Sequence, residues 1–339
     1  MVEQKLLKKE SETEYERSSR EKRNFLSKIF NWIITHIKFL LIPGYISDDL
    51  MHRQTEYEKT KSQRKFITRF KSVLTIVGLI LMFIIISFAI FAPWLSPYSR
   101  FWLTFPQYGG WQPPSPEHLL GTAQDGFDIL GRMIWGARTS LTVALPALFL
   151  AVAGGCVIGI VGAYYGGIID TILMRIVDIM LSFPSIVLIL VFIAIWGREM
   201  RYFILAYGIL GMAGYARIIR GSVLQAKNLP YVDAARVSGA SNFRIMFKHI
   251  LPNVIQPVIV TFTFDIGGII LSFAGLSFLG FAQSGIIEWG YDLDKARGSF
   301  RTAPWAMIFP GLMIMITVLA FMLVGDGLRD ALDPRLKNL

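Results

Sequence analysis

The sequence predicts an all-α polytopic membrane protein with six transmembrane helices. Hydrophobic residues make up 53% of the 339 residues, and the mean hydropathy is +0.50, whereas soluble domains are ~45–50% apolar even when glycine is counted. The apolar residues form long runs, and Lys and Arg gather beside one end of several runs, as in membrane proteins whose basic loops lie in the cytoplasm.

Composition also excludes several other classes of protein. The net charge is +10, but the basic residues lie in the N-terminal segment and beside apolar runs, which argues against a nucleic-acid partner. The single cysteine, Cys156, lies within an apolar run and is expected to be a small core residue rather than part of a disulfide framework. The four histidines are scattered without metal-ligand spacing, so no metal site is predicted.

Residues 1–72 are predicted to form a cytoplasmic, basic N-terminal region. Within it, residues 29–46 are apolar, but Asn31, His36, Lys38 and Pro43 interrupt the ~18–20 apolar residues that a membrane span requires. We expect an amphipathic helix at the membrane interface there, in contact with lipid. An uncleaved signal segment is the alternative.

The first transmembrane helix is predicted over residues 73–95, and an external loop over residues 96–140. Residues 141–328 are predicted to form a core with five further spans. Residues 329–339 are predicted to form a cytoplasmic tail. The five spans are expected at residues 141–164, 169–196, 203–219, 251–281 and 307–328. Gly155, Gly159, Gly162 and Gly166 recur at helical spacing and predict a face where helices pack closely.

Residues 228–253 are polar and basic, although they lie between two apolar runs. Pro230 suits the first turn of a helix, and Gly239 can end that helix in the left-handed conformation. Ser241 or Asn242 can cap a second short helix. Residues 217–248 contain six Lys and Arg against one acid, Asp233, so this helix–turn–helix elbow is expected in the cytoplasm.

The elbow resembles the EAA loop of the membrane subunits of ATP-driven (ABC) importers. The resemblance lies in Asp233-Ala234-Ala235, Gly239 and Leu251-Pro252 at the family's spacing. Asp233 stands where glutamate is usual, and His249 stands where isoleucine is usual. A histidine at this position is common in the dipeptide and oligopeptide branch of the family, so it narrows the resemblance to that branch.

Three further blocks resemble the same permeases, in the expected order. They lie at residues 120–141 before the second span, at residues 276–280 (LSFLG), and at residues 325–335 at the end of the chain. The family usually has an acid shortly before the LSFLG block, where this chain has Phe273 and Ala274. The resemblance covers about three quarters of the chain.

The resemblance implies a type I ABC importer transmembrane fold with a cytoplasmic coupling helix. It implies a permease subunit for dipeptides or oligopeptides in the plasma or inner membrane, with both termini cytoplasmic. The implied partners are a homologous second permease subunit, two ABC ATPase subunits and an external substrate-binding protein. The chain has no Gly-x-x-x-x-Gly-Lys-Ser/Thr loop and no nucleophile–base constellation, so we expect a non-catalytic subunit without cofactors whose partners bind ATP.

Two groups of residues carry these implied roles. Contact with an ATPase is expected at the elbow, where two adjacent alanines leave a small, flat helix face: Asp233, Ala234, Ala235, Arg236 and Gly239. The residues expected along a pathway are Asp178, Ser182, Pro184, Ser185 and Asp265.

Two of the pathway positions allow a physical expectation. Arg175 and Asp178 lie one helical turn apart and can pair, and Pro184 should break the third span. Asp265 lies within an apolar run, where a carboxylate must face protein or water. It can either meet the cationic amino end of a substrate or form a hydrogen bond between helices.

Other functions remain open at this point. Nickel, glutathione or small sugars are alternative substrates within the same family. A carrier or channel working alone, or a membrane anchor or signalling subunit, would belong to a different class. Neither of these classes needs the Asp-Ala-Ala-x-x-x-Gly elbow.

Overall fold

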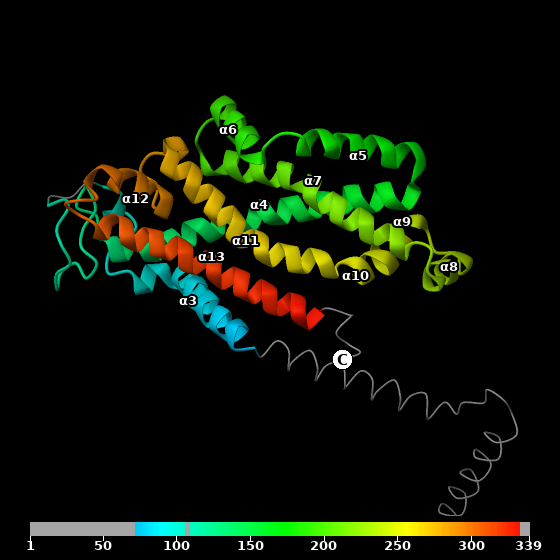
Figure 1. The fold of residues 1–339 in the computed structure, drawn as a ribbon, viewed down its shortest axis with the longest axis horizontal. Coiled ribbons are helices and arrows are strands. Elements are labelled where there is room, and N and C mark those ends of the chain that lie inside the picture. The colour runs from blue at the N-terminus through cyan, green and yellow to red at the C-terminus, as the bar shows by residue number, and fades with distance from the viewer. Residues whose placement is uncertain (1–71, 106–108, 333–339) are drawn as a thin grey trace, which may run out of the picture. The chain divides into compact units, whose positions relative to one another are not determined.

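A computed structural model describes residues 72–105 and 109–332, and helices dominate these ranges (Figure 1). The expected interfacial helix at residues 29–46 and the end of the C-terminal tail lie outside the described residues. Within these ranges, five helices are long and apolar enough to cross a membrane: α3 (Val73–Leu95), α4 (Ile129–Tyr165), α7 (Met200–Ala226), α11 (Gln256–Leu276) and α13 (Trp305–Leu332).

The predicted third span is a bent pair of helices. α5 (Gly167–Leu181) and α6 (Ser185–Trp196) meet at 85°, and counting the pair as one span gives six in the described residues. Pro184 is the N-cap of α6 with a ψ of 124°, outside the helical region. The predicted break at this proline is confirmed. Its physical cause is the proline ring, which removes a backbone hydrogen-bond donor and restricts the conformation of the preceding residue.

α4 begins at Ile129, well inside the stretch predicted to be an external loop over residues 96–140. Asp128 caps it, since its Oδ1 accepts a hydrogen bond from the Gly131 N–H at 2.7 Å. Ile129 and Met133 are buried. The prediction of a loop was wrong for residues 129–140. Charged residues interrupt the apolar run there, so the pattern does not indicate a span, but neighbouring segments bury this part of the helix.

The connection between α11 and α13 is also folded. It contains α12 (Trp289–Ala296), which packs against the end of α11 and against α13. The Trp289 side chain is fully buried, and its Nε1 donates to the Met133 carbonyl oxygen of α4 at 3.1 Å. The connection over residues 282–304 is therefore more than a plain loop.

A buried arginine holds these connections together. Arg132 is 2% exposed; its Nε donates to Asp292 Oδ1 at 2.7 Å, and its other nitrogens donate to the Leu103 and Ile286 carbonyl oxygens. Burial raises the pKa of both Asp292 and Glu288, and Arg132 opposes the rise in the pKa of Asp292. A buried charge needs such partners to avoid the cost of losing water.

α4 and α7 make the most extensive contact between helices, through the predicted glycine face. Gly155 and Gly159 lie against the backbone and side chains of α7 from Met212 to Ile219. Gly162 instead faces Asp170 of α5, and Gly166, with a φ of 67°, ends α4 rather than packing. The close-packing prediction is therefore confirmed at Gly155, Gly159 and Gly162. Cys156 is buried beside this contact, as expected.

The α4–α7 contact predicts the effect of adding a single methyl group. In Gly159→Ala, the new Cβ would lie 2.5 Å from the Ala216 carbonyl oxygen, so the helices must separate. Overpacking of this kind costs about 1–3 kcal/mol, and the protein should unfold at a lower temperature in detergent.

Gly221→Ala in α7 is the matched control. A Cβ there meets nothing within 4 Å, and alanine favours a helix by up to ~1 kcal/mol over glycine. It should leave the unfolding temperature unchanged or raise it. An unfolding temperature for Gly159→Ala equal to that of Gly221→Ala would contradict the close contact.

Candidate functional site

The predicted elbow is present at the end of the helices opposite α12 (Figure 1). α8 (Pro230–Val237) begins with Pro230 in its first turn, and Gly239 follows it with a φ of 77°. Ser241 then caps α9 (Asn242–Arg244), which continues as a π-helix (Ile245–Ile250) and α10 (Leu251–Val254). The cap is Ser241 rather than Asn242, because the Ser241 Oγ accepts the Arg244 N–H.

α8 has one buried face and one exposed face. Val232 is fully buried, and α8 packs on the π-helix. Asp233, Ala234 and Arg236 are exposed, and Val237 is 90% exposed. Asp233 and Arg236 pair at 2.9 Å on this exposed face, where an ion pair contributes about 0–1 kcal/mol. The exposed face therefore presents the small Ala234 side chain and an ion pair that holds Asp233 and Arg236 only weakly.

Polar contacts attach the elbow to α4, and they attach the neighbouring part of α7 to α5. The Tyr164 hydroxyl at the end of α4 donates to Asn242 Oδ1 of α9 at 2.9 Å. Arg220 of α7 donates from Nε and Nη2 to both carboxylate oxygens of Asp170 in α5, each at 2.7 Å. A bidentate pair of this kind fixes the relative orientation of two helices.

A second ion pair joins α5 and α7. Arg217 donates to Asp178 at 2.8 Å, so the expected pairing of Arg175 with Asp178 is wrong. Asp170 and Asp178 lie eight residues apart, about two helical turns, and therefore face α7 together. The sequence spacing alone could not reveal a partner on a different helix.

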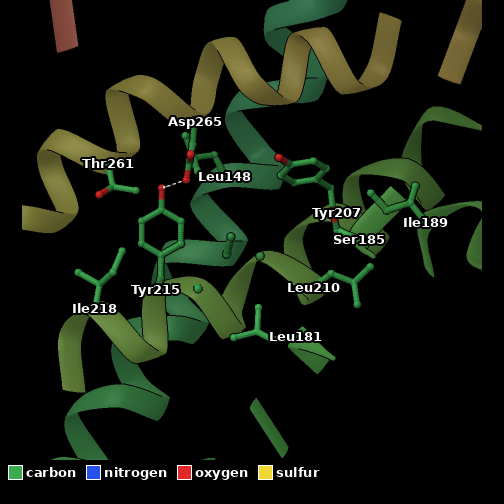
Figure 2. A pocket seen from close by; sticks show the side chains of 13 residues that line it. Leu148, Leu181, Ser185, Ile189, Tyr207, Leu210, Tyr215, Ile218, Thr261 and Asp265 are labelled. Atoms are coloured by element: carbon green, nitrogen blue, oxygen red, sulfur yellow. Dashed lines mark hydrogen bonds between the residues drawn. The ribbon is translucent and has the colours of Figure 1, made fainter. Parts of the chain in front are cut away.

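A cavity of about 230 Å³ opens between α4, α5, α6, α7 and α11 (Figure 2). Its lining is mostly apolar, and Asp265 of α11 is the one carboxylate among the lining residues. The Tyr215 hydroxyl of α7 donates to Asp265 Oδ2 at 2.6 Å. The lining residues are Leu148, Ala151, Leu181, Ser185, Ile189, Tyr207, Leu210, Gly211, Gly214, Tyr215, Ile218, Thr261 and Asp265.

The five residues predicted along a pathway lie at three different places in the structure. Asp265 and Ser185 line the cavity. Pro184 and Ser182 lie at the bend between α5 and α6, where the Ser182 hydroxyl donates to the Ile179 carbonyl oxygen at 2.7 Å. Asp178 pairs with Arg217 and does not line the cavity.

Sequence analysis missed Tyr207 and Tyr215, which both line the cavity from α7. They lie eight residues apart, about two helical turns, in a span otherwise rich in small residues. That spacing was a usable signal. Within residues 72–105 and 109–332, no group of three His, Cys, Asp or Glu side chains could hold a metal ion.

Comparison with known proteins matches two family models. Residues 155–338 match the binding-protein-dependent transport system inner membrane component, and this match contains the whole elbow. Residues 65–114 match the N-terminal transmembrane domain of oligopeptide transport permease C.

Individual relatives align over most of the chain. The dipeptide transport system permease protein DppC of Alkalihalophilus pseudofirmus is 43% identical over 269 residues, covering 79% of this chain and 88% of that protein. DppC of Haemophilus influenzae is 40% identical, covering 78% and 91%. The glutathione transport system permease protein GsiD of Pectobacterium atrosepticum is 39% identical over 279 residues, covering 81% and 92%.

The bidentate pair between α5 and α7 predicts a charge-swap rescue. Arg220→Asp should destabilise the purified protein by about 1–3 kcal/mol, because it leaves Asp170 without its partner and adds a like charge. The double variant Asp170→Arg with Arg220→Asp should recover part of this loss in thermal unfolding.

Arg236→Gln is the control for this measurement, because it removes an exposed pair in α8. It should change the free energy of unfolding by less than ~1 kcal/mol. A double swap no more stable than the single Arg220→Asp variant would show that Asp170 and Arg220 do not interact.

Proposed function

Because this chain belongs to the family of binding-protein-dependent transport system inner membrane components, we propose that it is the permease subunit that carries dipeptides or oligopeptides in an ATP-driven importer. The observation that carries this proposal is its 40–43% identity to the two dipeptide permeases over most of its length. Glutathione transport is the second candidate, supported by 39% identity to GsiD.

The proposal includes the partners that such a permease needs. These are a homologous second permease subunit, two ABC ATPase subunits and an external substrate-binding protein. The family description itself names a binding-protein-dependent system. The chain has no phosphate-cradling loop of its own, so ATP would be bound by the ATPase subunits.

The exposed face of α8 is the proposed contact with an ATPase subunit in the cytoplasm. Asp233, Ala234 and Arg236 are exposed on it, and Ala235 lies half-buried beside them. Small side chains allow a partner's surface to approach the helix closely. The left-handed Gly239 then returns the chain toward α9.

Motion of α8 would reach the cavity through α7 and α4. α7 ends at Ala226, only a few residues before Pro230 begins α8, and α7 supplies six of the lining residues: Tyr207, Leu210, Gly211, Gly214, Tyr215 and Ile218. The Tyr164–Asn242 hydrogen bond ties the elbow to α4, which lines the cavity with Leu148 and Ala151. Nucleotide and substrate would thus bias the same two-state arrangement.

The cavity is the proposed part of the pathway contributed by this subunit. Its volume of about 230 Å³ is smaller than the ~300–1,000 Å³ of typical small-ligand sites. A second permease subunit facing it would enlarge the site. Ser185 and Asp265 would contact the substrate, whereas Asp178, Ser182 and Pro184 would shape the bend beside it.

The function is tested by uptake of a labelled dipeptide into proteoliposomes that contain both permease subunits and the ATPases. Uptake should require ATP and the external binding protein, and it should stop when the ATPases are left out. Uptake by this chain alone would contradict the proposal and favour a carrier that works without ATPases.

In the same assay, Gly239→Val should lower ATP-driven uptake about tenfold or more while the complex still assembles. Its φ of 77° is strained for a β-branched residue, so the turn that positions α8 must shift. No atom lies within 4 Å of a Cβ at this position, so the effect is not a clash.

Gly239→Asn is the matched control, because asparagine adopts the left-handed conformation more readily than other side chains. It should keep most of the uptake. Wild-type uptake by the valine variant would show that the geometry of the elbow does not matter for transport.

A further inference from the structure

Asp265 is a carboxylate in a mostly apolar cavity without a cationic partner among the described residues. It is half-buried, and the ion pairs found within residues 72–105 and 109–332 do not include it. An ionisable group within a membrane span is costly unless it meets a partner or water. The Asp265 carboxylate is therefore placed to bind a cationic group of a ligand that enters the cavity.

The geometry leaves part of this carboxylate available. Tyr215 is 3% exposed, and its hydroxyl holds Asp265 Oδ2 at 2.6 Å. No residue of the described ranges donates a hydrogen bond to Oδ1. The hydrogen bond between α7 and α11 thus fixes the orientation of the carboxylate while one oxygen can still accept from a ligand.

Aromatic rings flank the carboxylate. Figure 2 shows Tyr215 and Tyr207 extending from α7 toward the same cavity that Asp265 enters from α11. A carboxylate beside tyrosine rings suits an ammonium group, since it combines charge, hydrogen-bond acceptance and cation–π attraction. It suits a metal ion less well, because a single carboxylate supplies too few of the charged ligands that a metal site needs.

We propose that Asp265, held by Tyr215 and flanked by Tyr207, binds the amino-terminal ammonium group of the peptide as it crosses the membrane. This inference rests on the proposed function and adds a chemical requirement to it. A free amino terminus would favour passage through this subunit, whereas an acetylated amino terminus, which carries no charge, would lose the contact. The hydrogen bond to Tyr215 is part of the site.

The first test compares import of dialanine by the wild-type transporter and by Asp265→Asn. Both are reconstituted with the second permease subunit, the ATPases and saturating binding protein. Import by the Asn variant should fall about tenfold or more, while ATPase activity stimulated by the binding protein shows that the complex still assembles. Thr263→Val removes a hydroxyl from a residue of α11 that does not line the cavity, and it should keep import within about twofold of wild type.

The second test separates recognition of the amino group from a general loss of activity. Without the binding protein, dissociation constants of dialanine and N-acetyl-dialanine for the purified complex are measured by ligand-observed NMR. The wild type should bind dialanine about tenfold more tightly, and Asp265→Asn should bind the two about equally. If the Asn variant does not assemble, Tyr215→Phe replaces it and should reduce the preference about twofold to fivefold.

An unchanged preference in Asp265→Asn, or in Tyr215→Phe where that variant is used, would overturn the inference. Equal binding of both ligands by the wild type would do the same. The proposed function would fail separately, if the wild-type transporter imported no dialanine with ATP and the binding protein present. Wild-type import with unaltered import by Asp265→Asn would reject only the ammonium site.

Discussion

The close approach of α4 and α7 is the contact on which the other features depend. Gly155 and Gly159 allow the two backbones to meet, because a helix pair in lipid is stabilised by close packing rather than by exclusion of water. The pair forms one wall of the cavity and continues at one end into the elbow. A wider separation would change both the cavity and the position of α8.

Polar contacts are distributed according to their surroundings. Arg132 and Asp292 form a buried node among the connections at one end, and Asp170 with Arg220 joins α5 to α7 toward the other. Among the residues lining the cavity, Tyr215 of α7 and Asp265 of α11 are joined by a hydrogen bond. This arrangement keeps the helix ends fixed and leaves one carboxylate at the cavity, where we propose that the substrate binds.

Local sequence signals predicted much of this structure. Pro184, Gly239 and the glycines of α4 act through their own backbone, so the break, the turn and the packing face could be assigned without tertiary information. The early start of α4, the burial of α12 and the Asp178–Arg217 pair depend on contacts between distant segments. The spacing of Tyr207 and Tyr215 indicated a shared face of α7, but their nearness to Asp265 depends on the contact with another helix.

We propose that the exposed face of α8 contacts an ATPase subunit, and cysteine crosslinking can detect this contact. The native Cys156 is 6% exposed, so a cysteine introduced at Ala234 should be the accessible one. In the assembled, transport-active complex it should crosslink to an ATPase, whereas a control cysteine at Leu119, 64% exposed near the start of α4, should not. The absence of a crosslink from Ala234, in a complex that hydrolyses ATP and imports peptide, would show that α8 does not contact the ATPase.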